Sequence, residues 1–109
     1  MTFTQSHRHG VLAKNTKGRL INCVITQCRW SGIWCRVNAL IELEGDQTKV
    51  DGNVTDGYGY YYGLYTYDTS STIHLLFPLT KDSVSTNNHG GRNYDSLSGG
   101  IIETVNGFG

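Results

Sequence analysis

Apolar and polar residues alternate along several short segments of this chain, which is the pattern of half-buried β-strands. The clearest segment runs from Ile33 to Glu44. Its apolar positions recur at every second residue: Ile33, Cys35, Val37, Ala39, Ile41 and Leu43. No segment shows a sustained helical stripe with a cap at one end and a glycine stop at the other. The pattern therefore predicts an all-β fold, with the repeating apolar set facing the core.

Turn signals between these segments predict hairpins. Trp30-Ser31-Gly32 joins an expected strand over Arg19 to Arg29 to the segment over Ile33 to Glu44. Asp51-Gly52 is a strong signal for a type I′ turn and predicts a second, exposed hairpin. Shorter strands are expected over 10–14 and 101–105.

Two registers compete for the hairpin over residues 19–44. If Ser31-Gly32 is a two-residue turn, Cys28 lies opposite Cys35. If Trp30-Ser31-Gly32 is a three-residue loop, Ile25 faces Val37, and Gly32 takes the left-handed position that such loops favour. The second register is favoured, because a two-residue I′ turn would force Ser31 to a positive φ.

A tyrosine-dense segment, Tyr58 to Asp68, predicts a strand that turns at 68–71 and pairs with Thr72 to Leu79. One face of this pair is apolar. The other face presents, beside His74, the three tyrosines Tyr61, Tyr65 and Tyr67. This face is either an exposed contact surface or a second core face. Tyrosine offers a large, rigid contact area with a polar tip, which suits a binding surface.

The expected fold is one domain over residues 1–109, a small antiparallel barrel or a two-sheet sandwich built from hairpins. Residues 1–9 are expected to form a flexible N-terminal arm, and residues 80–100 a long polar, glycine-rich loop. No repeat with a period of 20–50 residues is evident. Both faces of the first hairpin carry apolar residues, so a second sheet or another copy of the chain is expected to cover one of them.

Composition narrows the function classes. The formal net charge is +0, with nine basic and nine acidic residues, which argues against a general binder of duplex DNA. No apolar run suggests a secretory signal or a membrane span, so the cytoplasm is the expected compartment. Three cysteines, an odd number, do not make a complete disulfide framework and are expected to be buried thiols. No Cys or His pair has the spacing of a structural zinc site, and neither a metal nor a cofactor is expected.

Two further groups join the tyrosines and His74 as candidate partner-binding residues. The first lies near the expected hairpin tip and combines arginine with tryptophan, a composition typical of interface hot spots: Arg29, Trp34 and Arg36. The second lies on the long loop: His89, Arg92 and Tyr94. His89 with Asp95 is the best pair for acid–base chemistry, but no catalytic motif accompanies it, so no catalytic residue is assigned.

These features predict a non-enzymatic binding module, of the accessory or inhibitor kind found in viruses and mobile elements. It would dock onto a protein or a protein–nucleic-acid assembly through the aromatic face, the hairpin tip or the long loop. A structural assembly subunit, with homo-oligomers, is a second hypothesis. A β-barrel that binds a nucleotide or single-stranded nucleic acid by base stacking is a third. An enzyme that processes nucleotides or phosphodiesters through the long loop is the least favoured.

Overall fold

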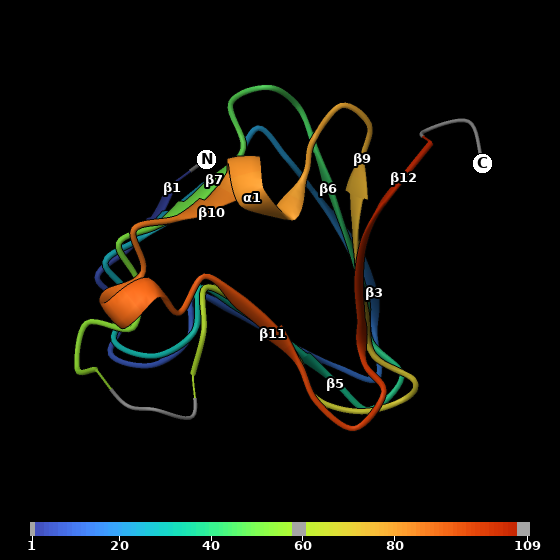
Figure 1. Ribbon diagram of the computed structural model, residues 1–109, viewed down its shortest axis with the longest axis horizontal. Coiled ribbons are helices and arrows are strands. Elements are labelled where there is room, and N and C mark those ends of the chain that lie inside the picture. Colours follow the sequence, from blue (N-terminus) through green and yellow to red (C-terminus); the bar gives the residue numbers. More distant parts are fainter. Residues whose placement is uncertain (1, 58–60, 107–109) are drawn as a thin grey trace.

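The computed structural model describes residues 2–57 and 61–106, and in it the chain winds as a coil of four rungs (Figure 1). A rung here means one turn of the coil, which contributes one strand to each of three sheets. Every pair of neighbouring strands is parallel. The architecture is therefore a β-solenoid, whose three sheets form the sides of a triangular cross-section.

Twelve strands make up the three sheets, four in each. Sheet A consists of β1 (Thr2–Thr4), β4 (Val24–Thr26), β7 (Lys49–Asp51) and β10 (Ser85–Thr86). Sheet B consists of β2 (Val11–Lys14), β5 (Ile33–Arg36), β8 (Leu64–Thr66) and β11 (Tyr94–Ser96). Sheet C consists of β3 (Lys17–Ile21), β6 (Leu40–Glu44), β9 (Thr72–Leu76) and β12 (Ile101–Val105). A short helix α1 (Lys81–Val84) and a 3-10 turn η1 (His89–Gly91) lie in the fourth rung.

The expectation of an antiparallel barrel or hairpin sandwich is wrong, because strands adjacent in the sequence lie in different sheets. Alternation has the same period in parallel and antiparallel strands, so it does not distinguish the two. The 19–29 segment breaks at Asn22 (φ 50°) into β3 and β4. The 33–44 segment breaks at Val37 (φ 50°) and Asn38 (φ 65°) into β5 and β6. Neither hairpin register exists, and Val37 is exposed rather than buried.

Three other segments also differ from their expected form. Within 58–68, residues 58–60 lie outside the described residues, and Leu64–Thr66 is the only strand among the rest. This strand does not pair with Thr72–Leu76, which lies in sheet C between β6 and β12. The expected loop over 80–100 contains α1, β10, η1 and β11, and the expected arm over 1–9 contains β1, which pairs with β4.

The corner between sheets A and B is built in the same way in each rung. A residue with positive φ follows every strand of sheet A: Gln5, Gln27, Gly52 and Asn87. Buried asparagines then link successive rungs. Asn53 accepts a hydrogen bond from the Cys28 N–H at 3.0 Å, and the Asn53 N–H donates to Asn88 Oδ1 at 2.9 Å. These bonds satisfy backbone groups that would otherwise be unpaired inside the turn.

A glycine precedes three strands of sheet B: Gly10, Gly32 and Gly63. The backbones of these glycines approach closely, since a Cβ on Gly32 would lie 2.8 Å from the Gly63 carbonyl oxygen. The motif of glycine followed by an apolar residue is the repeat that the sequence analysis missed. Its unequal intervals, from 10 to 32 and from 32 to 63, hide it from a search for one fixed period.

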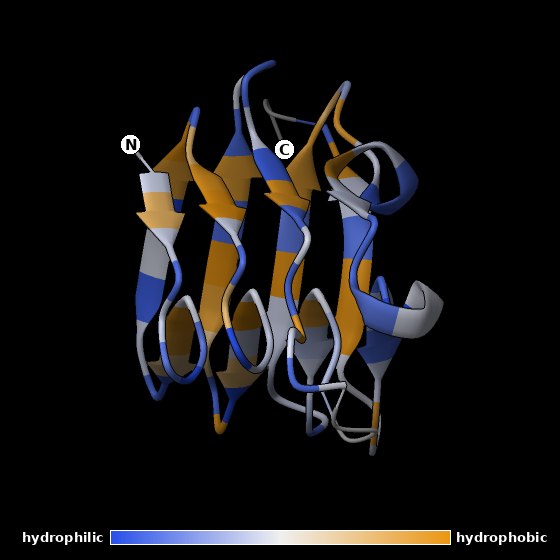
Figure 2. Cartoon of the chain, turned by 90° about the vertical axis from the view of Figure 1, so that its left-hand side faces the viewer, coloured by the Kyte–Doolittle hydropathy of each residue, from blue (hydrophilic) through white to orange (hydrophobic). Residues whose placement is uncertain are grey.

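The core fills the inside of the coil with aliphatic side chains from all three sheets. Ile25, Ile33, Leu43, Leu64 and Leu75 are at most 1% exposed. Burying each such side chain stabilises the fold by about 1.5–3 kcal/mol. Figure 2 shows the rungs side by side, with apolar segments recurring along the strands. Because the inward positions are taken by this core, the alternate residues of each strand are left to form the outer faces.

Candidate binding groove

The outer face of sheet B carries two columns of side chains, one residue from each rung. In the first column, Trp34 is the register partner of Leu12 on one side and of Tyr65 on the other, and Asp95 follows Tyr65. In the second column, Lys14 is the register partner of Arg36. Parallel, in-register pairing therefore gathers residues that are far apart in the sequence onto one face.

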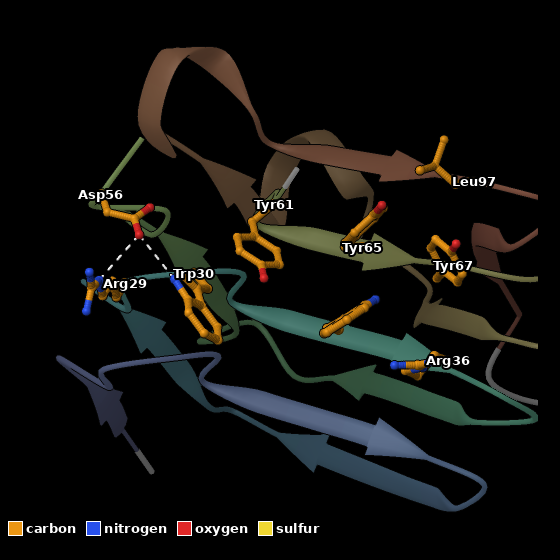
Figure 3. A pocket seen from close by; sticks show the side chains of 9 residues that line it. Arg29, Trp30, Arg36, Asp56, Tyr61, Tyr65, Tyr67 and Leu97 are labelled. Carbon is orange, nitrogen blue, oxygen red and sulfur yellow. Dashed lines mark hydrogen bonds and ion pairs between the residues drawn. The ribbon is translucent and has the colours of Figure 1, made fainter. Parts of the chain in front are cut away.

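A groove of about 810 Å³ runs along this face (Figure 3). Nine residues line it: Arg29, Trp30, Trp34, Arg36, Asp56, Tyr61, Tyr65, Tyr67 and Leu97. Its volume lies in the range of small-molecule and oligomer-binding clefts, roughly 300–1,000 Å³. The groove is therefore large enough to hold a ligand of several rings.

The aromatic rings of the groove pack mainly against one another. Trp30 stacks on Tyr61, with centroids 5.1 Å apart, and Trp34 stacks on Tyr65, with centroids 5.9 Å apart and planes 12° apart. The His9 ring lies between these two pairs, 4.6 Å from the Trp34 ring and 5.0 Å from the Tyr61 ring. These contacts between rings hold the aromatic side chains of the groove in place.

Tyr65 is buried although it lies on the outer face. Its neighbours leave it 4% exposed, whereas Tyr67, next along this face, is 42% exposed. Burial, together with the negative charge of Asp95, raises the pKa of Tyr65 to about 12. Tyr65 therefore stays protonated and packs against its neighbours. Tyr67 is the more accessible of the two tyrosines for a partner.

At one end of the groove a carboxylate is paired with an arginine. Asp56 accepts hydrogen bonds from the Arg29 guanidinium at 3.3 Å and from the Trp30 indole N–H at 3.1 Å (Figure 3). The carboxylate holds both side chains in place. A second guanidinium, that of Arg8, lies 5.6 Å from the centroid of the Trp30 ring.

The other end carries an uncompensated positive charge. The Arg36 guanidinium lies 5.4 Å from the Trp34 ring centroid and 6.0 Å from that of Tyr67. No carboxylate among the described residues lies within ion-pair distance of it. Arg36 Nε and Trp34 Nε1 are also shielded from solvent without a hydrogen-bond acceptor in the described chain. Such unpaired donors are rare in folded proteins and often mark sites that are completed by a ligand or water.

The groove brings together six of the ten residues proposed from the sequence and separates the other four. His74 lies on sheet C, where its Nε2 is 3.1 Å from Glu103 Oε2. Tyr94 points to α1, where its hydroxyl donates to Asp82 at 2.6 Å. Arg92 lies over the Tyr62 ring, and His89 is exposed in η1. The long-loop residues thus do not form one cluster.

Three groove-lining residues have no place in the sequence-based proposal, nor has His9, which packs against the groove rings: Trp30, Asp56 and Leu97. The repeat of glycine and apolar residue would have aligned Trp34 with Tyr65 and Arg36 with Tyr67. It would not have found Trp30 or Asp56, because both lie in corner segments whose path depends on the asparagine hydrogen bonds.

All three cysteines are free and buried, and burial raises the pKa of the Cys35 thiol to about 12. In the described ranges, no group of three or more His, Cys, Asp or Glu side chains could hold a metal ion. The helices of residues 2–57 and 61–106 include none long and apolar enough to cross a membrane, and the cytoplasmic compartment stays a prediction.

Comparisons of this chain with protein-family models, with curated proteins and with solved structures give no match. The functional argument therefore depends on the geometry of the groove alone.

Proposed function

We propose that this protein is a non-enzymatic binding module whose ligand lies in the aromatic groove on sheet B. The observation that carries the proposal is Arg36, a half-buried guanidinium with no counter-ion among the described residues, at one end of a groove rich in tyrosine and tryptophan. Buried charge without a partner is costly, and a ligand that supplies the partner recovers this cost. Tyrosine, tryptophan and arginine are also the residues that contribute most to binding energy at interfaces.

The rigid backbone supports the same proposal. The groove residues lie on strands or on corners fixed by hydrogen bonds, so little conformational entropy is lost when a ligand binds. The groove also has no base held by an orienting partner beside a nucleophile, which a hydrolytic site needs. Asp56, the one carboxylate that lines it, is paired with Arg29.

The test is a binding screen against oligosaccharide, oligonucleotide and peptide arrays with three proteins. These are the wild type, the double variant Arg36→Gln/Tyr67→Ala, and the control Lys49→Gln on sheet A. We expect the double variant to lose every ligand that the wild type captures and the control to keep them. Ligands that bind the double variant as well as the wild type would refute the proposal.

A second candidate function, an assembly subunit, is supported by the ends of the coil. The first-rung strands β2 and β3 carry three basic residues and no acidic one: Lys14, Lys17 and Arg19. The last-rung strands β11 and β12 carry two acidic residues and no basic one: Asp95 and Glu103. Both ends leave strand edges without a neighbour in the described chain, and such edges are sites of pairing with another chain.

Stacking of copies head to tail would extend one column of sheet C. The column Arg19, Glu42, His74, Glu103 would continue with Arg19 of the next copy, so that opposite charges meet. Sedimentation velocity at micromolar concentration tests this. We expect oligomers that dissociate at high salt or in Glu103→Arg but not in the corner control Asp46→Arg. A wild type that stays monomeric would refute the assembly role.

A further inference from the structure

We propose that the ligand of the sheet B groove is an acidic oligosaccharide, whose carboxylate pairs with Arg36 while its hydroxyl groups bond to the polar rim of the groove. This inference rests on the proposed function, since it names the ligand class for the same site. It draws on three features of the groove: its charge, its unpaired donors and its volume.

The charge at this end of the groove favours an anionic ligand. Lys14 is the register partner of Arg36, so two cations lie side by side on the outer face. Asp68 lies just beyond this end, but its carboxylate accepts from the Val37 N–H at 2.8 Å and from the Ser70 hydroxyl at 3.0 Å. Asp95 lies beside Tyr65 in the other column. Arg36 is thus left to an anion that comes from outside.

The geometry of the donors favours a carboxylate. A guanidinium presents its N–H groups as a planar fork, which matches the two oxygens of a carboxylate. Arg36 Nε and Trp34 Nε1 both lack an acceptor, and the Arg36 side chain packs over the Trp34 ring. Both nitrogens are shielded from solvent, so side chains around them must move before a ligand oxygen can accept from them.

The charges of the groove favour a saccharide over a nucleic-acid strand. A single strand carries one phosphate for each nucleotide and needs a continuous basic track. Arg29 and Arg36 are the cations among the described residues that line the groove, and Arg29 is paired with Asp56. Carboxylates accept hydrogen bonds from hydroxyl groups, guanidinium groups donate to them, and phenol groups do both.

The volume favours a short oligomer over a protein surface. A groove of about 810 Å³ is of the size that encloses a small ligand. A stable protein interface usually covers about 800 Å² of each partner with a broad apolar centre. The exposed apolar residues of this face, Leu12, Tyr67 and Leu97, lie along the groove rather than forming such a centre.

The experiment compares two tetrasaccharides by isothermal titration calorimetry: α-1,4-linked tetragalacturonate, and the galactose tetramer of the same linkage. They differ only in the C6 carboxylate. We expect the wild type to bind the acidic tetramer about tenfold more tightly, which is the usual contribution of one charge-assisted pair. In Arg36→Gln we expect this preference to disappear while the neutral tetramer binds as before. Lys49→Gln, at an exposed position of β7 on sheet A, should behave as the wild type.

Arg36→Lys is a second variant, which keeps the positive charge and loses the planar fork of N–H groups. We expect its preference for the acidic tetramer to lie between those of the wild type and Arg36→Gln. Equal affinity of the wild type for both tetramers would overturn the requirement for a carboxylate. If the wild type binds neither tetramer but binds oligo(dT) or an oligoglutamate peptide through Arg36, the saccharide inference is overturned and the proposed function stands. Saccharide binding that is unchanged in both Arg36 variants and in Tyr67→Ala would overturn both the saccharide inference and the proposed function.

Discussion

His9 Nδ1 accepts a hydrogen bond from the Ser31 backbone N–H at 3.1 Å, which ties the first rung to the second beneath the aromatic groove. The same imidazole lies between the rings of Trp30, Trp34 and Tyr61. A protonated imidazole cannot accept this bond, because both ring nitrogens then carry hydrogen. The groove and the fold thus depend on one neutral histidine.

Stability should therefore fall in mildly acidic solution. Burial, and secondly the charge of Arg8, lower the pKa of His9 from 6.5 to about 4 in the folded protein. Between these values the unfolded chain binds more protons than the folded one, so the free energy of unfolding decreases as the pH falls from about 6.5 to about 4. Urea denaturation at several pH values measures this decrease.

The variant His9→Gln is the control for that prediction, since its amide oxygen can accept from the Ser31 N–H without titrating. It should lose most of the pH dependence in this window. Asp68 does not contribute to the pH dependence in this window. Its pKa is lowered, chiefly by the hydrogen bond from the Val37 N–H, so its contribution is lost only below about pH 3.8. A wild type as stable at pH 4.5 as at pH 7 would contradict the role of His9.

The two neighbouring tyrosines of the groove should respond differently to truncation. Tyr65 is 4% exposed and stacked on Trp34, so Tyr65→Ala should lower the free energy of unfolding by about 3 kcal/mol. Tyr65→Phe keeps the ring and should cost less than about 1 kcal/mol. Tyr67→Ala should leave stability almost unchanged and weaken ligand binding. Equal destabilisation by Tyr65→Ala and Tyr67→Ala would show that both tyrosines belong to the core.

Glycine at position 32 should be irreplaceable for steric reasons. A Cβ there would lie 2.8 Å from the Gly63 carbonyl oxygen and 3.0 Å from Asn53 Nδ2, so Gly32→Ala should destabilise the fold by at least about 2 kcal/mol. Gly18→Ala is the matched control, since its Cβ would lie 3.5 Å from Ile41 Cδ1, an ordinary contact. The control should be neutral or stabilising by up to about 1 kcal/mol. Chemical denaturation of both variants measures this. Similar losses in the free energy of unfolding would contradict the close packing of the Gly32 and Gly63 backbones.

The asparagine column should contribute to the corner between sheets A and B. Asn53→Ala removes the acceptor of the Cys28 N–H and the donor to the Ile25 carbonyl, both buried. Each unpaired group costs about 1–3 kcal/mol, so the loss of both bonds should cost roughly 2–6 kcal/mol. Thr55→Ala, at an exposed position in the same segment, should be neutral. Rapid amide hydrogen exchange at Cys28 in Asn53→Ala would report the same loss locally.

The sequence predicts the strand content of this protein but not its topology. Alternation at Ile33, Cys35, Ile41 and Leu43 correctly marks inward positions, because that period depends only on the strand. The parallel coil depends on single residues with positive φ, such as Asn22 and Gln27, which look like ordinary strand residues in the sequence. When these corners are not recognised in the sequence, the shortest connection between two strands is a hairpin. The sequence therefore predicts hairpins.

The same cause limits what the sequence says of the groove. Arg36 and Tyr67 were expected on separate hairpins, and the coil places them on neighbouring strands of one face. His74 was expected beside the tyrosines, and the corner at 68–71 moves it to sheet C, where it meets Glu103. The sequence thus identifies candidate residues by their type, but which of them lie together depends on the path of the chain.

The most direct test of the binding groove is a ¹H–¹⁵N spectrum recorded while tetragalacturonate is added. The chain has two tryptophans, so we expect two indole N–H signals, together with the Nε–H signal of a structured arginine. We predict saturable shifts for Trp34 Nε1 and Arg36 Nε, and smaller ones for Trp30 Nε1, which already donates to Asp56. Shifts confined to other faces of the coil, or signals of Trp34 and Arg36 that stay in place at saturating ligand, would contradict the account.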